Sequence, residues 1–144
     1  MKIRKIITHV LMAAMFITTV PVSVGAASDD TGKFNFVLQP KEYDYSKQVV
    51  NTLGTKKVGE SATVIVNSYS IPSNCIFNVR IVKHTTDDSS NDVLYSTAVT
   101  ITQADTYNPV YSKEVTNNIG YKLRGHVTKD SSTGGSASGS WSLN

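Results

Sequence analysis

The chain has 144 residues, with 14 lysines and arginines against 11 aspartates and glutamates, which gives a formal net charge of +3. Lys2, Arg4 and Lys5 lie in an N-terminal segment without acidic residues, so 11 cations remain against 11 anions in the rest of the chain. This balance argues against a nucleic-acid-binding protein, because the positive excess lies in a segment that we predict to be removed. Charged residues make up only 17 % of the chain, whereas 40 % hydrophobic residues are too many for a disordered polyelectrolyte. The composition predicts a small ordered domain of low charge.

The N-terminus has the pattern of a cleaved export signal. A positive start at 1–5 precedes an apolar run over 6–20, and Pro21 ends that run. Small residues follow, and they suit cleavage near Ala26 or Ala27. The alternative is an uncleaved membrane anchor. Spanning a bilayer takes about 20 apolar residues, and this run is shorter and is interrupted by Thr and His. We therefore predict a signal peptide over 1–27, a secreted single domain over 28–144 and no membrane span after cleavage.

Hydrophobic residues recur at every second position in the remaining chain, which is typical of half-buried antiparallel strands. Clusters of Gly, Pro, Asn, Asp and Ser separate these strands. The predicted strands are 33–38, 47–53, 60–69, 74–83, 93–101, 107–115, 120–128 and 139–143. A Ser- and Gly-rich loop is expected over 129–138. Seven or eight short strands favour an antiparallel β-sandwich over a small closed barrel, so the expected fold class is all-β.

Two of these strands divide clearly into an inner and an outer face. The inner set is Cys75, Phe77, Val79 and Ile81 in one strand and Tyr121, Leu123, Gly125 and Val127 in the other. The outer set is Asn78, Arg80, Lys122, Arg124 and His126. A slip of one residue in 74–83 would bury an arginine, so the register is well specified. Aliphatic residues on both faces of 60–69 predict a central strand, and Pro109 predicts an edge or a bulge in 107–115.

Four short motifs carry a resemblance to a known group of proteins. They are Phe34-x-Phe36, the Gly-Glu-Ser-Ala-Thr-Val stretch over 59–64, Tyr121-x-Leu123-Arg124-Gly125 and the closing Ser-Gly-Ser-Trp at 138–141. Together they resemble an uncharacterised family of small secreted proteins from Gram-positive bacteria. The resemblance implies export and an all-β fold. It implies no activity and no site residues.

Residues that could ligate a metal are sparse. His84 and His126 have no metal-ligand spacing to each other or to Cys75, so we predict two surface histidines and a buried, inert thiol. The segment 87–92 concentrates the oxygen ligands that calcium prefers, including Asp87, Asp88 and Asp92. It lacks the glycine and the closing glutamate of an EF-hand. A weak calcium site there is the alternative to a solvated turn, and the principal prediction is that the protein binds no metal.

No catalytic motif is present. The nearest approach to Gly-x-Ser-x-Gly is 135–139, where Ala137 takes the central position. The glutamates show no pairing of the kind used in glycoside hydrolysis, and no glycine-rich loop precedes a helix. We therefore predict a protein that is not an enzyme and takes no cofactor.

The tyrosines are the remaining feature. Tyr43, Tyr45, Tyr107 and Tyr111 fall on weak strands, strand ends or loops, and we select them as candidate binding residues. An exposed ring can stack on a sugar or anchor a protein partner, although tyrosine is also a common half-buried strand residue. Tyr43 and Tyr45 alternate, so their rings are expected to point the same way.

The expected function is that of a secreted extracellular binding or structural module. It would recognise a cell-surface glycan or a protein partner and no nucleic acid. The alternative is a bacteriocin-like antagonist of neighbouring bacteria, which would need a receptor or pore-forming strands, since no cationic amphipathic helix is visible. Self-association is a further expectation, because the edge strands of a β domain with low charge can pair with copies of themselves.

Overall fold

The computed structural model describes residues 31–39, 42–85, 89–128 and 134–144, and the predicted signal peptide lies outside them. Within these segments the chain forms ten strands and one short 3-10 helix. The strands are β1 (Thr31–Leu38), β2 (Tyr43–Tyr45), β3 (Val49–Val50), β4 (Thr63–Ser70), β5 (Ile76–Lys83), β6 (Val93–Leu94), β7 (Val99–Ile101), β8 (Thr106–Tyr107), β9 (Gly120–Thr128) and β10 (Gly135–Ser142), and the helix is η1 (Ser89–Asn91). The all-β prediction is confirmed.

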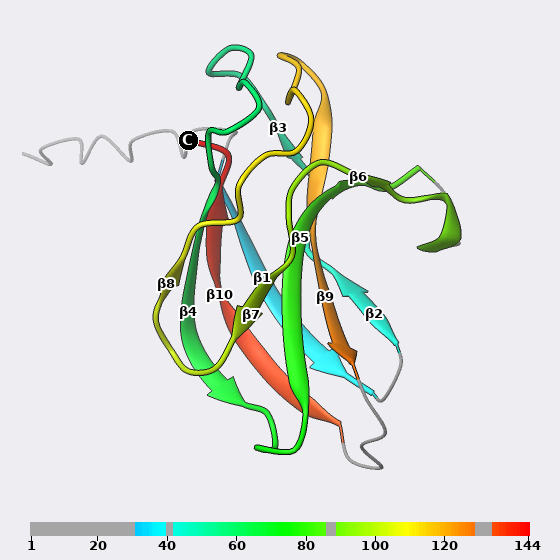
Figure 1. Cartoon of the computed structure of the whole chain (residues 1–144), viewed down its shortest axis with the longest axis vertical. Helices are drawn as coiled ribbons and strands as arrows, with labels where there is room; N and C mark the ends of the chain where they lie inside the picture. The colour runs from blue at the N-terminus through cyan, green and yellow to red at the C-terminus, as the bar shows by residue number, and fades with distance from the viewer. Residues whose placement is uncertain (1–30, 40–41, 86–88, 129–133) are drawn as a thin grey trace, which may run out of the picture.

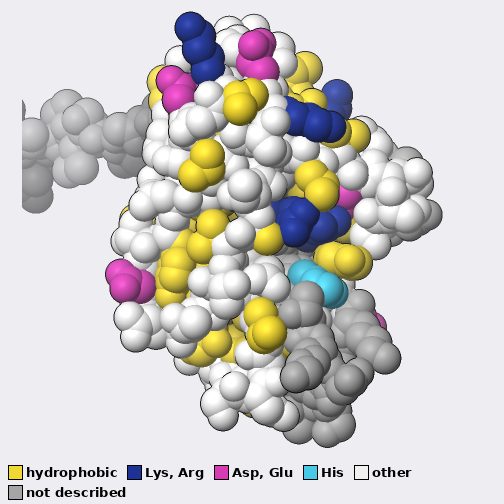
Figure 2. Space-filling model, viewed as in Figure 1, with side chains coloured by type: hydrophobic (Ala, Val, Ile, Leu, Met, Phe, Trp, Pro, Cys, Tyr) yellow, Lys and Arg dark blue, Asp and Glu magenta, His cyan; other side chains and the backbone are white. Residues whose placement is uncertain are grey.

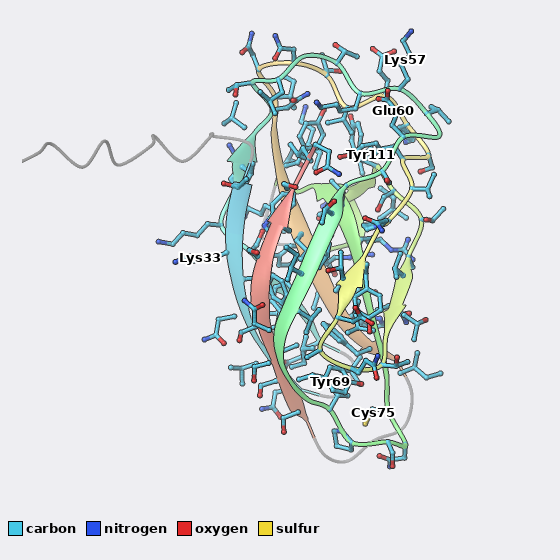
Figure 3. The ribbon with its side chains drawn as sticks, turned by 90° about the vertical axis from the view of Figure 1, so that its left-hand side faces the viewer. Lys33, Lys57, Glu60, Tyr69, Cys75 and Tyr111 are labelled. Atoms are coloured by element: carbon cyan, nitrogen blue, oxygen red, sulfur yellow. The ribbon has the colours of Figure 1, made fainter. Side chains whose placement is uncertain are left out.

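The strands form two antiparallel sheets. Sheet A has the order β1-β10-β4-β8, and sheet B has the order β2-β9-β5-β6, with β3 also paired to β9 and β7 to β5. The two sheets pack face to face, as Figure 1 shows, and sheet A lies in front in Figure 3. This arrangement confirms the predicted antiparallel β-sandwich, and β4 is an interior strand of sheet A as expected. Among the residues that the structure describes, no helix is long and apolar enough to cross a membrane.

The core lies between the sheets and follows the predicted alternation. All eight inner residues predicted for the strands that became β5 and β9 are buried, including Cys75. The largest fully buried side chains come from both sheets and from the segment after β8: Trp141, Tyr111, Tyr121, Phe36 and Phe77. The rings of Phe36 and Phe77 meet edge to face at 6.3 Å between centroids. Burial of these side chains is the main stabilising contribution in a domain whose one described cysteine, Cys75, forms no disulfide.

One glycine allows the two sheets to approach closely. Gly125 lies in β9 opposite Phe36, and a Cβ at this position would lie 2.7 Å from Cδ2 of the phenyl ring. Because Phe36 has no exposed surface, its ring has little room to move. Phe36 therefore packs directly beneath the backbone between Arg124 and His126.

Two predicted strands are interrupted in the structure. The prediction of a single strand over 93–101 is wrong, because β6 and β7 are separate strands that each pair with β5. Between them Ser96 is buried, and its hydroxyl accepts the N–H of Ile81 at 2.8 Å. Of 107–115 only Tyr107 belongs to a strand, and isolated bridges join Val110 to Ser61 and Tyr111 to Ser96. This segment crosses from sheet A to sheet B, and Pro109 lacks the N–H that a continuous ladder requires.

Two other boundaries also differ from the prediction. The weak strand over 47–53 is reduced to Val49–Val50, whereas the last strand begins at Gly135 and takes in residues expected to be loop. In β10 the pairing of Gly135–Ser138 with β1 supplies a partner for every one of these residues, which local composition did not indicate.

Candidate functional site

Register brings the outer residues of three strands together on sheet B. Across β9 and β5, Arg124 pairs with Arg80 and His126 pairs with Asn78. Across β2 and β9, Tyr43 pairs with His126 and Tyr45 with Arg124. Figure 2 shows basic and histidine side chains side by side over β5 and β9, which lie in front in this view.

A buried carboxylate lies at one side of this face. Asp92 follows η1, and its side chain is only 1 % exposed. Its Oδ2 atom accepts hydrogen bonds from the Tyr45 hydroxyl at 2.8 Å and from Nη1 of Arg124 at 2.7 Å. Its Oδ1 atom lies 2.6 Å from Nδ1 of His84. His84 donates this hydrogen bond when the imidazole carries a proton on Nδ1. Asp92 thus joins β2, β9 and the end of β5.

The surroundings of Asp92 keep it ionised. Burial by itself would raise the pKa of Asp92, but hydrogen bonds from His84, Tyr45 and Arg124, together with the charge of Arg124, outweigh it and lower that pKa. Burial and the hydrogen bond to Asp92 raise the pKa of Tyr45 to about 12. The Tyr45 ring also stacks on His84 at 4.1 Å between centroids. Asp92 therefore holds Arg124 in one orientation.

Next to this network is a pocket of about 320 Å³, which we call the cationic cup. It is lined by Tyr43, Asn78, Arg80, Arg124 and His126. The Tyr43 ring stacks on His126 at 4.3 Å between centroids, and the Arg124 guanidinium lies 4.4 Å from the centre of the same ring. The cup is thus built from a stacked tyrosine and histidine, two guanidinium groups and one amide.

The cationic cup carries uncompensated positive charge. Arg124 is paired with Asp92, but no carboxylate of the described residues forms an ion pair with Arg80. Burial and the nearby charge of Arg124 lower the pKa of Arg80. Burial followed by the charges of Arg124 and Arg80 lowers the pKa of His126. In addition, the buried Nε of Arg124 has no acceptor among the residues that the structure describes.

The polar groups of the cup are mainly hydrogen-bond donors. The Thr100 hydroxyl donates to Oδ1 of Asn78 at 2.8 Å, and the nitrogen of the same amide is a donor by its chemistry. Both guanidiniums are donors only. None of the five lining residues is a serine, cysteine or carboxylate, so the cup is suited to holding an anion and offers none of these nucleophiles.

A second, larger pocket of about 990 Å³ runs along β1 and the segment 45–49. Its polar lining consists mainly of hydroxyl and amide side chains, with Lys33 and Lys47 as its only charged residues. Figure 3 shows Lys33 projecting from β1 into solvent. Although this pocket has more volume, the cationic cup has the denser grouping of charged and aromatic side chains.

Of the four tyrosines selected from the sequence, two meet on the site. Tyr43 is 38 % exposed and lines the cup, and Tyr45 is half-buried in the Asp92 network. Both lie on the outer face of β2, so their rings point the same way as expected.

The other two tyrosines lie elsewhere and have structural contacts. The Tyr107 hydroxyl donates to the carbonyl of Gln103 at 3.0 Å and accepts the N–H of Thr102 at 3.2 Å, which braces the turn before β8. Tyr111 is 1 % exposed, and its hydroxyl donates to the carbonyl of Leu143 at 2.6 Å. Neither is part of the cationic cup.

The calcium candidates are divided between described and undescribed segments. Asp87 and Asp88 lie outside the described residues. Asp92 already accepts three hydrogen bonds, one of them from an arginine. No group of three potential metal ligands occurs among the His, Cys, Asp and Glu residues that the structure describes.

The prediction of surface histidines is wrong for His84. Its side chain is only 10 % exposed, because Asp92 and Tyr45 cover it. His126 is half-buried in the cup. The outer set of β5 and β9 was assigned correctly, but it was not identified as a site. The signal in the sequence was that each of these two strands has one outward arginine, Arg80 and Arg124. The pairing of the strands, which makes the arginines neighbours, could not be read from the sequence.

Comparison of the chain with protein families, with curated proteins and with solved structures found no match. The resemblance to small secreted proteins of Gram-positive bacteria stays a prediction.

Proposed function

We propose that this protein is a secreted, non-catalytic binding module that recognises an anionic group on a cell-surface glycan or a protein partner through the cationic cup. The observation that carries the proposal is the direct pairing of Arg80 with Arg124 across β5 and β9, with no carboxylate of the described residues paired to Arg80. Like charges that are directly opposite in a sheet destabilise it. A bound anion would remove this cost.

The cup is also organised before a ligand arrives. Asp92 and the Tyr43 ring hold the guanidinium of Arg124, so little side-chain freedom remains to be lost on binding. Arg80 is half-exposed and can reach a ligand from solvent. Tyr43 adds an aromatic ring at the rim, which suits a sugar or a side chain attached to the anion.

The test is an NMR titration of the purified protein with inorganic phosphate, inorganic sulfate and acetate at constant ionic strength. We expect saturable shifts of the Arg80 and His126 signals with at least one of these anions. Arg80→Gln should weaken this binding at least about tenfold, a loss typical of a charge-assisted hydrogen bond. Lys33→Gln is the matched control, since Lys33 is an exposed cation on sheet A, and it should bind like the wild type.

Two results would overturn the proposal. One is the absence of saturable shifts at Arg80 and His126 with all three anions. The other is equal weakening by Arg80→Gln and Lys33→Gln, because this would show that general surface charge attracts the anions.

A further inference from the structure

We infer that the cationic cup selects a tetrahedral oxyanion, the phosphate or sulfate group of a larger ligand, and that His126 takes up a proton when the bound group carries two negative charges, as a phosphate monoester does. This inference rests on the proposed function and adds the ligand class and its dependence on pH. It stands on the arrangement of the donors around the cup and on the balance of charge.

The residues that line the cup come from three strands, and the charged donors among them are the guanidiniums of Arg80 and Arg124. Arg80 and Asn78 lie on β5, Arg124 and His126 on β9, and Tyr43 on β2. A carboxylate is planar, and a single guanidinium can pair with both of its oxygens. Phosphate and sulfate present three or four oxygens in different directions, which is the arrangement that several separate donors can satisfy together. A pocket of about 320 Å³ is large enough to admit such a group with part of its attached ligand.

The charge balance leaves a role for His126. Asp92 neutralises one of the two guanidiniums, so Arg80, Arg124 and Asp92 together carry one net positive charge. One negative charge on a ligand would balance it. The second charge of a phosphate monoester or of inorganic sulfate requires a further cation, and the only other titratable group of the cup that can become positive is His126.

The groups that face His126 come from all three strands of the cup. They are the Tyr43 ring from β2, Asn78 and Arg80 from β5, and Arg124 from β9. Partial burial, followed by the charges of the two guanidiniums, lowers the pKa of His126. A bound oxyanion would add negative charge beside the ring and reverse this effect. Because linkage is reciprocal, an anion that raises the pKa of His126 must bind more tightly as the pH falls.

The experiment measures the ring signals of His126 between about pH 5 and 8, without ligand and with inorganic sulfate, inorganic phosphate or acetate. Sulfate keeps its double charge throughout this range, so any change in its affinity reports on the protein. We expect sulfate to bind at least about tenfold more tightly than acetate at the acid end and to raise the pKa of His126 by about one unit, which corresponds to a tenfold change in affinity.

The variant His126→Gln keeps a polar side chain that cannot be protonated. It should retain weaker sulfate binding through Arg80 and lose the dependence on pH. The measured midpoint of unfolding shows whether this variant is folded. If it is not, the shift in the pKa of His126 in the wild type decides the question.

The outcomes separate this inference from the proposed function. Acetate binding as tightly as sulfate would overturn the selection of a tetrahedral group and leave the anion site intact. Sulfate affinity that is constant with pH would overturn proton uptake by His126. No saturable shift with any anion would overturn both proposals. Tighter binding of phosphate than of sulfate would support the inference and identify a phosphate group as its ligand.

Discussion

The two outer faces of the sandwich have the same strand geometry, but their side chains differ in charge and aromatic content. On sheet A the outward positions of β1 and β10 hold Lys33 and Asn35 opposite Ser140 and Ser138, and Ile65 of β4 lies beside Ser140. On sheet B the corresponding positions hold two arginines, two tyrosines and a histidine. Alternation alone would leave both faces as ordinary solvated surfaces.

The difference comes from the segment after β5. His84 and Asp92 place a carboxylate beside Arg124, so this guanidinium is largely buried while remaining charged. Sheet A has no comparable buried ion pair among its described residues. A buried, oriented charge next to an unpaired one distinguishes a candidate binding face from a polar surface.

The largest expected effect is that of Asp92→Ala. Its removal leaves Arg124 as a buried cation without a counterion, and Tyr45 and His84 lose their acceptor, so the free energy of unfolding should fall by about 3 to 5 kcal/mol. Asn35→Ala on the outer face of sheet A is the control and should change it by less than about 0.5 kcal/mol. Urea denaturation measures both. Equal effects of the two substitutions would contradict the contrast between the faces.

Gly125→Ala should be the next most destabilising change. The added methyl group would lie 2.7 Å from the fully buried ring of Phe36, and overpacking of this kind costs about 1 to 3 kcal/mol. Ser138→Ala, on the outer face of β10, is the control and should be close to neutral. The same denaturation measurement applies. A Gly125→Ala protein as stable as the wild type would show that the sheets can move apart at this point.

Alkaline pH should weaken sheet B through Tyr45. The pKa of Tyr45 is about 12 in the folded protein, above the unfolded value of about 10. Its stabilising contribution is therefore fully present below about pH 10 and is lost as the pH rises toward 12. Unfolding free energies measured across this range should fall more steeply in the wild type than in Tyr45→Phe. Parallel curves would mean that Tyr45 ionises equally easily in both states.

The smallest expected effect has the opposite sign. Arg80→Gln removes one of two like charges that face each other, so it should stabilise the protein by roughly 0.2 to 1 kcal/mol at low salt, and less at high salt. Lys33→Gln, on sheet A, should not change stability measurably. Thermal unfolding at two salt concentrations measures both variants. A loss of stability in Arg80→Gln would indicate that Arg80 already has a counterion.

Much of the fold could be predicted because burial imposes a period of two on a strand. The inner and outer sets of β5 and β9 were assigned correctly for this reason. The interruption between β6 and β7 was missed, because it depends on Ser96 satisfying the N–H of Ile81 and not on hydrophobicity. The extension of β10 was missed because its serines and glycines look like a loop until β1 and β4 pair with them.

The candidate site could be predicted only in part. Tyr43 and Tyr45 were selected because they fall on weak strands, strand ends or loops, and Arg80, Arg124 and His126 were placed on outer faces. Their assembly into one cup depends on β9 pairing with both β2 and β5, which are far from it in the chain. Asp92 was read as a turn residue, since nothing near it in sequence indicates a partner 32 residues away.

The amino-acid sequence by itself determined the all-β class, the faces of the main strands and the presence of one outward arginine on each of two of them. These properties are local, because each side chain's face follows from its position in the alternation. Only the tertiary structure decided that the two arginines are direct neighbours, that a buried carboxylate holds one of them and that the other has no ion-pair partner among the described residues. Such properties depend on long-range strand pairing, where the free energy of burying a charge is set by groups that the chain brings together only on folding.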